Sequence, residues 1–392
     1  MLLASIDWGC CMSKIKIAAL MAATSIASVL LTLGGLCYAL DMTGQKMGDV
    51  LRFAGVYRLI ESHYVTDVDS TKLMDGAISG MIQSLGDPHS IYLDPKTYHQ
   101  LMEQTIGSFG GIGIYMGFKD NKVSVISVMD DSPAARAGIQ ANDEILAVDG
   151  VSVTEIQPEE VAIHIRGEVG TEVTLSIRRN GTEDKEFVIQ RDTIQVKTAE
   201  GRMLENNMGY IRIAAFSENT AQEFRDAYEA LENEGMKGLV IDLRENPGGL
   251  VTSSVEIANM VVPEGPVVSV VERDGGKEEY TSSLKELKYP LVVLIDGNSA
   301  SAAEILAGAV QDTGAGTLVG SKSFGKGSVQ TVLPMFHDDA VKLTIAKYYT
   351  PSGRNIDGVG IEPDVSIDFQ PEDTEDVQLA KAEEVLRTKM GE

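Results

Sequence analysis

Cysteine and histidine are scarce in this 392-residue sequence, and their positions exclude several kinds of site. The three cysteines lie within the first forty residues, at Cys10, Cys11 and Cys37. The rest of the chain therefore has no disulfide, thiol nucleophile or cysteine metal site. The histidines stand singly, without the spacing typical of zinc sites, at His63, His89, His99, His164 and His337. We predict neither a metal nor another cofactor.

Positive charge is also in short supply. The sequence has 33 lysines and arginines against 58 aspartates and glutamates, a formal net charge of −25. Phosphate contacts require clustered basic residues, so this composition argues against nucleic acid as a partner. The length allows two or three domains, each with its own hydrophobic core.

The first forty residues have the pattern of a membrane-targeting segment. An uncharged apolar stretch from Ile17 to Leu40 follows Lys14 and Lys16. It is longer than the ~20 residues of a spanning helix, whereas a signal core has only ~7–15. We expect residues 1–40 to be a retained single-pass signal anchor, with the N-terminal end in the cytoplasm and the rest of the chain outside.

Two alternatives concern the same segment. Cleavage near "CYA" at 37–39 would instead give a secreted or periplasmic protein. Translation from Met12 rather than Met1 would remove the first eleven residues.

Four segments with different patterns follow along the chain. Apolar residues at helical spacing predict a small helical segment over 47–106, interrupted by Asp-Pro pairs at Asp87 and Asp94. Short β-branched runs, with a tight-turn Asn180-Gly181 pair, predict a β-rich domain over 107–192. Strands then alternate with helices over 193–368, the pattern of an α/β domain with a largely parallel sheet. Residues 369–392 read as an acidic linker and one closing helix.

The stretch "GSKSFGKGSVQ", from Gly320 to Gln330, nearly matches a phosphate-binding loop. Gly327 stands where that loop has Ser or Thr, and the next residues read as a strand rather than a helix. A nucleotide-binding protein is therefore a minor alternative. The position of Lys326 between two glycines, next to Phe324, instead suits a lysine whose pKa is lowered by desolvation.

Ser301 begins an S-x-x-E pattern in "NSASAAEILAG". The structural interpretation is a helix cap worth ~1 kcal/mol. The functional interpretation is a nucleophile at a helix N-terminus, where free amides stabilise developing negative charge. The N–H of Ala302 would then be one oxyanion donor, and Gly248 or Gly249 would bring a second.

A serine nucleophile needs a base. Three loops follow predicted parallel strands: "RENPGG", "GNSASAAE" and the loop that contains Lys326. None of them contains a histidine. Sequence order alone does not exclude a Ser-His-Asp triad, because its members can be distant in the chain. Lys326 is the remaining candidate. Gln330 shares one face of the following strand with Lys326 and would orient its amine.

Taken together, "GNSASAAEILAGAVQD", "GSKSFGKGSVQT" and "LVIDLRENPGGL", with an inserted domain, resemble the C-terminal processing serine peptidases of family S41. This resemblance implies an α/β peptidase core of the ClpP/crotonase type. It also implies Ser301 as nucleophile, Lys326 as base and Gln330 as the accompanying glutamine. Ser299 is the neighbouring serine without that role.

The segment from about Gly107 to Asp192 resembles a PDZ domain. Its glycine-rich loop has free N–H groups suited to a terminal carboxylate, and an open strand edge beside it would pair with an extended peptide. The matching residues are Gly110, Gly111, Ile112, Gly113 and Ile114. The resemblance implies that apolar protein C-termini are selected. Arg166 and Arg244 are candidates for contacts that couple the two domains, or ordinary surface arginines.

A binding protein of another class stays open. A PDZ-containing scaffold on a degenerate peptidase core would capture protein tails without cutting them. A homo-oligomer or a regulatory partner is equally compatible with the helical segment, whose apolar face also suits packing within one chain.

Overall fold

The computed structural model describes residues 14–39, 44–119, 122–181, 183–370 and 373–391. The chain divides into two compact units, Met1–Gly80 and Met81–Glu392. The first unit is helical, as predicted, with α1 (Lys14–Ala39), α2 (Gly44–His63) and most of α3 (Ser70–Gln83).

Against the expected anchor, none of the helices within the described residues combines the length and apolarity of a membrane span. Residues 1–13 and Leu40, part of the predicted signal anchor, lie outside the described residues. The choice between Met1 and Met12 as the start falls there as well.

The second unit begins with a short strand and a helix. The Asp-Pro pairs do interrupt helix, but Asp94 also starts one, because its side chain accepts the Thr97 N–H as the N-cap of α4 (Pro95–Ile106). Between the two pairs lies an unpredicted strand, β1 (Ile91–Leu93). Its pairing with β18 joins this segment to the second sheet of the larger domain.

The β-rich domain forms a sheet in the order β3-β4-β5-β7-β8, with β6 paired to β5. A separate antiparallel pair, β2 (Ser108–Gly111) with β9 (Asp192–Gln195), lies where the chain enters and leaves the domain. The β-rich domain has its own hydrophobic core of aliphatic side chains, separate from the core of the larger domain. The other elements are β3 (Ile114–Lys119), β4 (Lys122–Val128), α5 (Pro133–Ala137), β5 (Glu144–Val148), β6 (Val151–Ser152), α6 (Pro158–Ile165), β7 (Glu172–Arg179) and β8 (Glu183–Gln190).

The larger domain is built on a six-stranded sheet in the order β10-β11-β12-β15-β16-β19. From β11 to β19 neighbouring strands are parallel, and only β10 is antiparallel, as expected from the strand–helix alternation. The elements are β10 (Ala199–Met203), β11 (Met208–Ile213), α7 (Thr220–Asn233), β12 (Gly238–Asp242), α8 (Val251–Val261), β15 (Leu291–Ile295), α9 (Ala302–Thr313), β16 (Thr317–Gly320), β19 (Val365–Ser366) and α10 (Val377–Met390).

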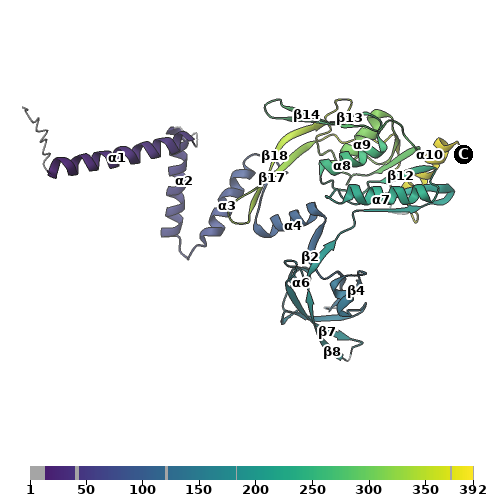
Figure 1. The fold of residues 1–392 in the computed structure, drawn as a ribbon, viewed down its shortest axis with the longest axis horizontal. Coiled ribbons are helices and arrows are strands. Elements are labelled where there is room, and N and C mark those ends of the chain that lie inside the picture. The colour runs from purple at the N-terminus through teal and green to yellow at the C-terminus, as the bar shows by residue number, and fades with distance from the viewer. Residues whose placement is uncertain (1–13, 40–43, 120–121, 182, 371–372, 392) are drawn as a thin grey trace, which may run out of the picture. The chain divides into compact units, whose positions relative to one another are not determined.

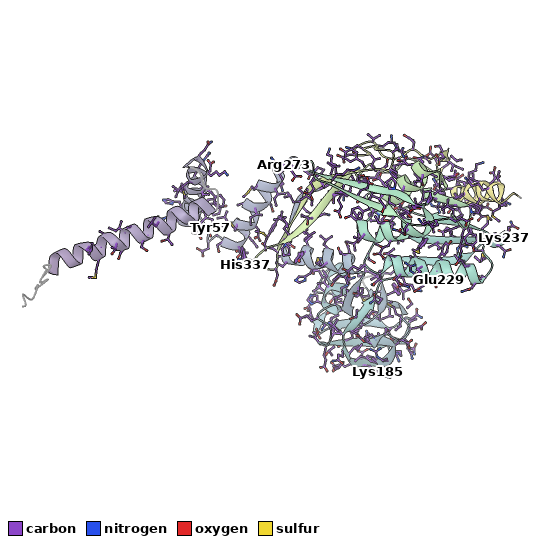
Figure 2. All side chains as sticks on the ribbon, turned by 45° about the horizontal axis from the view of Figure 1, so that its top comes forward. Tyr57, Lys185, Glu229, Lys237, Arg273 and His337 are labelled. Carbon is purple, nitrogen blue, oxygen red and sulfur yellow. The ribbon has the colours of Figure 1, made fainter. Side chains whose placement is uncertain are left out.

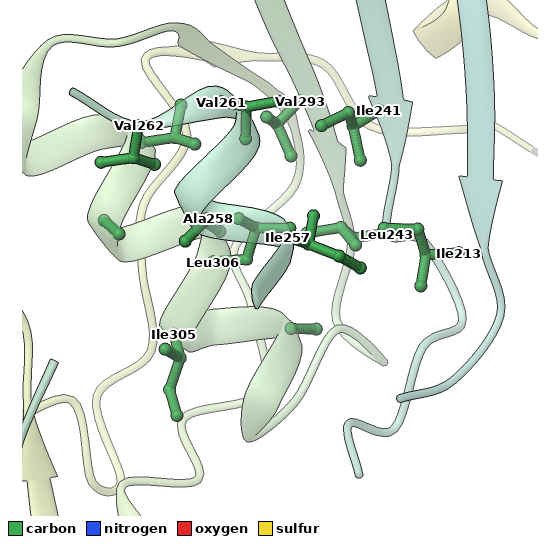
Figure 3. Close-up of a cluster of buried hydrophobic side chains, with 14 of the residues drawn as sticks. Ile213, Ile241, Leu243, Ile257, Ala258, Val261, Val262, Val293, Ile305 and Leu306 are labelled. Atoms are coloured by element: carbon green, nitrogen blue, oxygen red, sulfur yellow. The ribbon is translucent and has the colours of Figure 1, made fainter. Parts of the chain in front are cut away.

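Two hydrophobic clusters cover the two faces of this sheet. In one, Ile257 and Leu306 from α8 and α9 pack against strand residues such as Ile241 (Figure 3). In the other, Leu386 of α10 lies among strand residues such as Val292. The sheet is therefore buried on both faces, and its loops meet solvent mainly at the strand ends.

A second sheet was not predicted from the sequence. It joins β1, β13 (Gly265–Glu272), β14 (Lys277–Ser282), β17 (Ser328–Pro334) and β18 (Ala340–Tyr349). Strands β17 and β18 form a long hairpin with His337 in its turn (Figures 1 and 2). The fold class is confirmed: a mixed α/β core, an inserted β-rich domain and N-terminal helices.

Candidate active site

Three loops meet at the carboxyl ends of neighbouring parallel strands. The loop after β12 contacts the loop after β15, since Ala300 N–H donates to Asn246 O at 2.9 Å. The loop after β15 contacts the loop after β16, since Phe324 N–H donates to Ser299 O at 3.0 Å. Ligands gather at this edge of open α/β sheets, and all the predicted core site residues lie in or next to these loops.

Ser301 caps helix α9 in a strained backbone conformation. Its φ of 55° and ψ of −117° lie outside the helical and extended regions, at a cost of order 1–3 kcal/mol for a non-glycine residue. The expected capping box with Glu304 is present. Ser299 is buried instead, and its hydroxyl donates to Leu243 O at 2.8 Å. Of the two serines, only Ser301 is partly open to solvent.

The loop between β16 and β17, residues 321–327, contains Lys326 and is called the lysine loop below. It packs closely against the segment around Gly358. A Cβ at Gly327 would lie 2.7 Å from Asp357 N, and one at Gly325 would lie 2.8 Å from Gly360 N. The absence of a side chain at Gly325 and Gly327 thus allows the loop to pack tightly around Lys326. The next element is strand β17, so the helix that a phosphate loop requires is absent from this described segment.

Glu304 joins the serine and lysine loops. Its side chain is fully buried and accepts four hydrogen bonds. Oε1 accepts from Ser323 Oγ at 2.6 Å and from Gly325 N at 2.8 Å. Oε2 accepts from Lys326 N at 2.8 Å and from Ser301 N at 2.9 Å. One carboxylate oxygen therefore holds the backbone of both Ser301 and Lys326.

Tyr348 of β18 makes a second link between the same two residues. Its buried hydroxyl shares its one proton between Lys326 O and Ser301 O, which lies 3.2 Å away. Burial, and then the Glu304 charge, raise the pKa of Tyr348 well above its usual value, so the hydroxyl keeps its proton. Ser301 and Lys326 are thus fixed through both their N–H and their C=O groups.

Lys326 lies half-buried, and no ion pair joins its ammonium to any described residue. Burial, and next the charge of Lys342, lower the pKa of Lys326, while Asp87 and Glu304 act in the opposite direction. A lysine with a lowered pKa is the base that a serine nucleophile requires.

Gln330 lies on β17, whereas Lys326 precedes that strand, which begins at Ser328, so the two residues do not share a strand face as expected. The Gln330 amide is held by its neighbours. Its Nε2 donates to Ser328 Oγ at 2.9 Å and to Thr344 Oγ1 at 3.2 Å. Ser328 and Gln330 therefore share a face, as the strand period requires. Gln330 and Lys326 are both within the described residues, and the expected hydrogen bond between the Gln330 amide and the Lys326 amine is not formed.

The oxyanion candidates differ in what their N–H groups bind. Gly248 N–H donates to Asn246 Oδ1 at 2.8 Å. The N–H groups of Gly249 and Ala302 donate to no described residue. A Cβ at Gly248 would lie 2.7 Å from Ser301 Cβ, so this glycine lets the loop approach the serine closely.

The PDZ-like loop also has free amides. The N–H groups of Ile112 and Gly113 donate to no described residue. A Cβ at Gly110 would lie 2.0 Å from Gly167 O, and one at Gly113 2.4 Å from Ser132 Cβ. Ile114 begins β3, an edge strand, so the expected open edge lies directly after the loop. Gly111 ends β2, where it pairs with Asp192.

The two arginines differ in their roles. Arg166 pairs with Glu103 of α4 at 2.9 Å and stacks on Phe109, so it links the β-rich domain to the preceding helix rather than to the α/β core. For Arg244 the expected coupling is wrong. Its guanidinium binds Asp242 at 2.6 Å and Asp376 at 2.8 Å, and therefore ties the start of α10 to the end of β12.

Sequence reasoning missed residues from a distant segment. Ser90 Oγ donates to Asp87 Oδ2 at 2.6 Å and accepts the Thr344 N–H at 3.0 Å. This turn is thereby attached to β18 beside Gln330. Its only sequence signal was the Asp-Pro pair, which marks a turn without showing what it contacts. Among the described residues no cluster of three or more metal-ligating side chains occurs.

Three family profiles match parts of this chain. The profile of peptidase family S41 matches residues 207–367, a PDZ profile matches 110–189, and that of the activating protease CtpB N-terminal domain matches 36–97. Carboxy-terminal processing protease CtpB of Bacillus subtilis is 42% identical over 317 residues, covering 79% of this chain and 66% of that protein.

Two further relatives and one structure are similar. CtpA of Bacillus subtilis is 41% identical over 83% of this chain and 70% of its own length. A carboxy-terminal-processing protease of Bartonella bacilliformis is 39% identical over 81% of this chain and 74% of its own. The photosystem II D1 C-terminal processing protease is 28% identical, with 84% and 96% coverage and a TM-score of 0.49. The chain spans 66% to 74% of these curated relatives' lengths. It belongs to serine peptidase family S41, the carboxy-terminal processing proteases, and carries a PDZ domain.

Proposed function

We propose that this protein is a serine endopeptidase that cleaves proteins near their C-termini with a Ser301–Lys326 dyad. One observation supports this function above the others. Glu304 and Tyr348 hold the backbones of both residues, and burial lowers the pKa of the Lys326 amine.

In the proposed reaction the Lys326 amine takes the Ser301 hydroxyl proton as Oγ attacks the scissile carbonyl carbon. The N–H groups of Ala302 and Gly249, which have no partner among the described residues, would stabilise the oxyanion. The lysine ammonium then gives its proton to the leaving amine. A water molecule, deprotonated by the same amine, hydrolyses the acyl-enzyme ester and restores both side chains.

The PDZ domain would select substrates by their apolar C-terminal tails. The free amides of Ile112 and Gly113 suit a terminal carboxylate, and the open edge of β3 suits an extended peptide. Export and membrane attachment belong to the proposal on sequence grounds only, from Lys14 and Lys16 ahead of the apolar stretch. Fractionation of cells that express the full chain would test this part.

The dyad is tested by Ser301→Ala and Lys326→Ala. We expect each to lower peptide hydrolysis by roughly a thousandfold or more while leaving the fold intact. Lys322→Ala is the matched control, because Lys322 lies in the same loop but is exposed and pairs with Glu362. Full activity in either dyad variant would refute the assignment.

The alternative is a scaffold that binds tails without cutting them. Mass spectrometry of an unstructured protein before and after incubation separates the two, since a binding protein leaves its partner intact. New termini that disappear with Ser301→Ala support the peptidase. Tail binding without new termini supports the scaffold.

A further inference from the structure

Lys342 lies on β18, two residues before Thr344, and its charge acts on Lys326. In the β17–β18 hairpin, Gln330 lies opposite Thr344 and Val332 opposite Lys342. Thr344 and Lys342 are two residues apart on one strand, so their side chains point to the same face. The Gln330 amide donates both to Thr344 Oγ1 and to the hydroxyl of Ser328, which directly follows the lysine loop, so this face continues from that loop.

The Lys342 ammonium has no acidic partner among the described residues, although the side chain is half-buried. The next lysine on the same strand is different, because Lys347 pairs with Asp357 at 3.3 Å. An unpaired, partly desolvated cation costs free energy. Its place beside the site suggests a use for the charge rather than a role in holding the fold.

Other charges also act on Lys326. Asp87, whose pKa is lowered by hydrogen bonds from Ser90 and Thr344 although burial opposes this, favours the protonated lysine. Glu304 acts in the same direction, and Lys342 in the opposite one. Burial also lowers the pKa of Lys342, but no nearby carboxylate opposes it there.

We propose that Lys342 is a positioning residue whose charge, acting through space from the neighbouring strand, keeps the Lys326 amine in its neutral, proton-accepting form. This inference rests on the proposed Ser301–Lys326 peptidase. Glu304 holds the lysine loop, and Asp87 binds Ser90, which is attached to β18. Both carboxylates favour the wrong protonation state for a base, and Lys342 offsets them.

The test is the pH dependence of kcat/KM for peptide hydrolysis with Lys342→Met in the full chain. Removal of the nearby positive charge favours protonated Lys326, so the acidic limb must move to higher pH. A single neighbouring charge shifts a titration by on the order of one pH unit. On the acidic limb this corresponds to roughly a tenfold loss of activity, with recovery at high pH.

Two controls isolate the charge. Lys342→Arg keeps it and must leave the acidic limb within about 0.3 pH unit of the parent, well under the one-unit shift expected from losing a charge. Lys237→Met removes one positive charge from an exposed position and must leave the profile unchanged. If Lys342→Met folds poorly, Lys342→Gln makes the same measurement with a polar side chain.

The outcomes are separable. A limb that shifts in Lys342→Met but not in Lys342→Arg supports the proposal. An unshifted limb, or a uniform loss at every pH, overturns it and leaves a structural role. Ser301→Ala runs in the same assay, and hydrolysis that survives in that variant refutes the peptidase itself rather than the part played by Lys342.

Discussion

Replacement of Glu304 by glutamine should both destabilise the protein and disable the site. The buried carboxylate accepts two hydrogen bonds on each oxygen, from Ser323 Oγ and the backbone N–H groups of Gly325, Lys326 and Ser301. Glutamine keeps the shape but turns one oxygen into an NH₂ group, which donates and cannot accept. Two donors then lose their acceptor.

The least costly arrangement places the NH₂ group at Oε1, because the Ser323 hydroxyl can rotate to accept. Gly325 N–H is then left buried and unsatisfied, and the remaining bonds lose the reinforcement of a charged acceptor. An unsatisfied buried donor costs about 1–3 kcal/mol, and bonds to a charged group contribute about 1.5–3 kcal/mol. We expect Glu304→Gln to lower the free energy of unfolding by about 2–4 kcal/mol.

The assay is urea unfolding followed by far-UV circular dichroism, with peptide hydrolysis measured in the folded baseline. The same bonds hold the Ser301 and Lys326 backbones, so activity should fall roughly a hundredfold even where the protein is folded. Glu256→Gln, at an exposed position on α8, is the control. An unfolding free energy within about 0.5 kcal/mol of the parent, as for an ordinary surface substitution, would refute the role given to Glu304.

Two further predictions concern the loop after β12. Gly248→Ala should lower kcat by roughly a hundredfold, because the new Cβ would lie 2.7 Å from both Ala300 O and Ser301 Cβ and displace the nucleophile. Gly353→Ala is the control for backbone strain, because Gly353 also has a positive φ but has open space around it. Equal losses of kcat in the two variants would contradict this reasoning. Arg244→Met should lower the free energy of unfolding by about 3–5 kcal/mol, because it leaves the buried Asp242 carboxylate without its ion-pair partner. The control is Arg178→Met, which breaks an exposed ion pair with Asp184 and should cost about 0–1 kcal/mol. Thermal unfolding compares the two, and limited proteolysis should cut near α10 only in the Arg244 variant.

Much of the architecture followed from local pattern. The alternation of apolar strands and amphipathic helices predicted the parallel sheet, because a βαβ chain has few ways to bury both faces. The S-x-x-E pattern predicted the helix start at Ser301, since capping depends only on residues within one turn. The run after Lys326 predicted a strand, and β17 is one.

Contacts between distant segments could not be predicted in this way. Glu304 read as the second half of a capping box, yet it also binds backbone groups of Gly325 and Lys326. Tyr348 and Asp87 carried no signal at all for a place beside the dyad. Arg244 followed a strand as a site arginine would, but it holds α10 instead.

The sequence by itself determined the order of the domains and the elements of the central sheet. It also determined that Ser301 and Lys326 lie in or next to loops that follow parallel strands. These depend on periodicity and on short-range hydrogen bonding, which neighbouring residues set. Only the tertiary structure decided which buried carboxylate and hydroxyl hold Ser301 and Lys326 together, and that Lys342 stands unpaired near them. Those features depend on burial and on charges brought close by folding, and both are properties of the packed chain rather than of any segment.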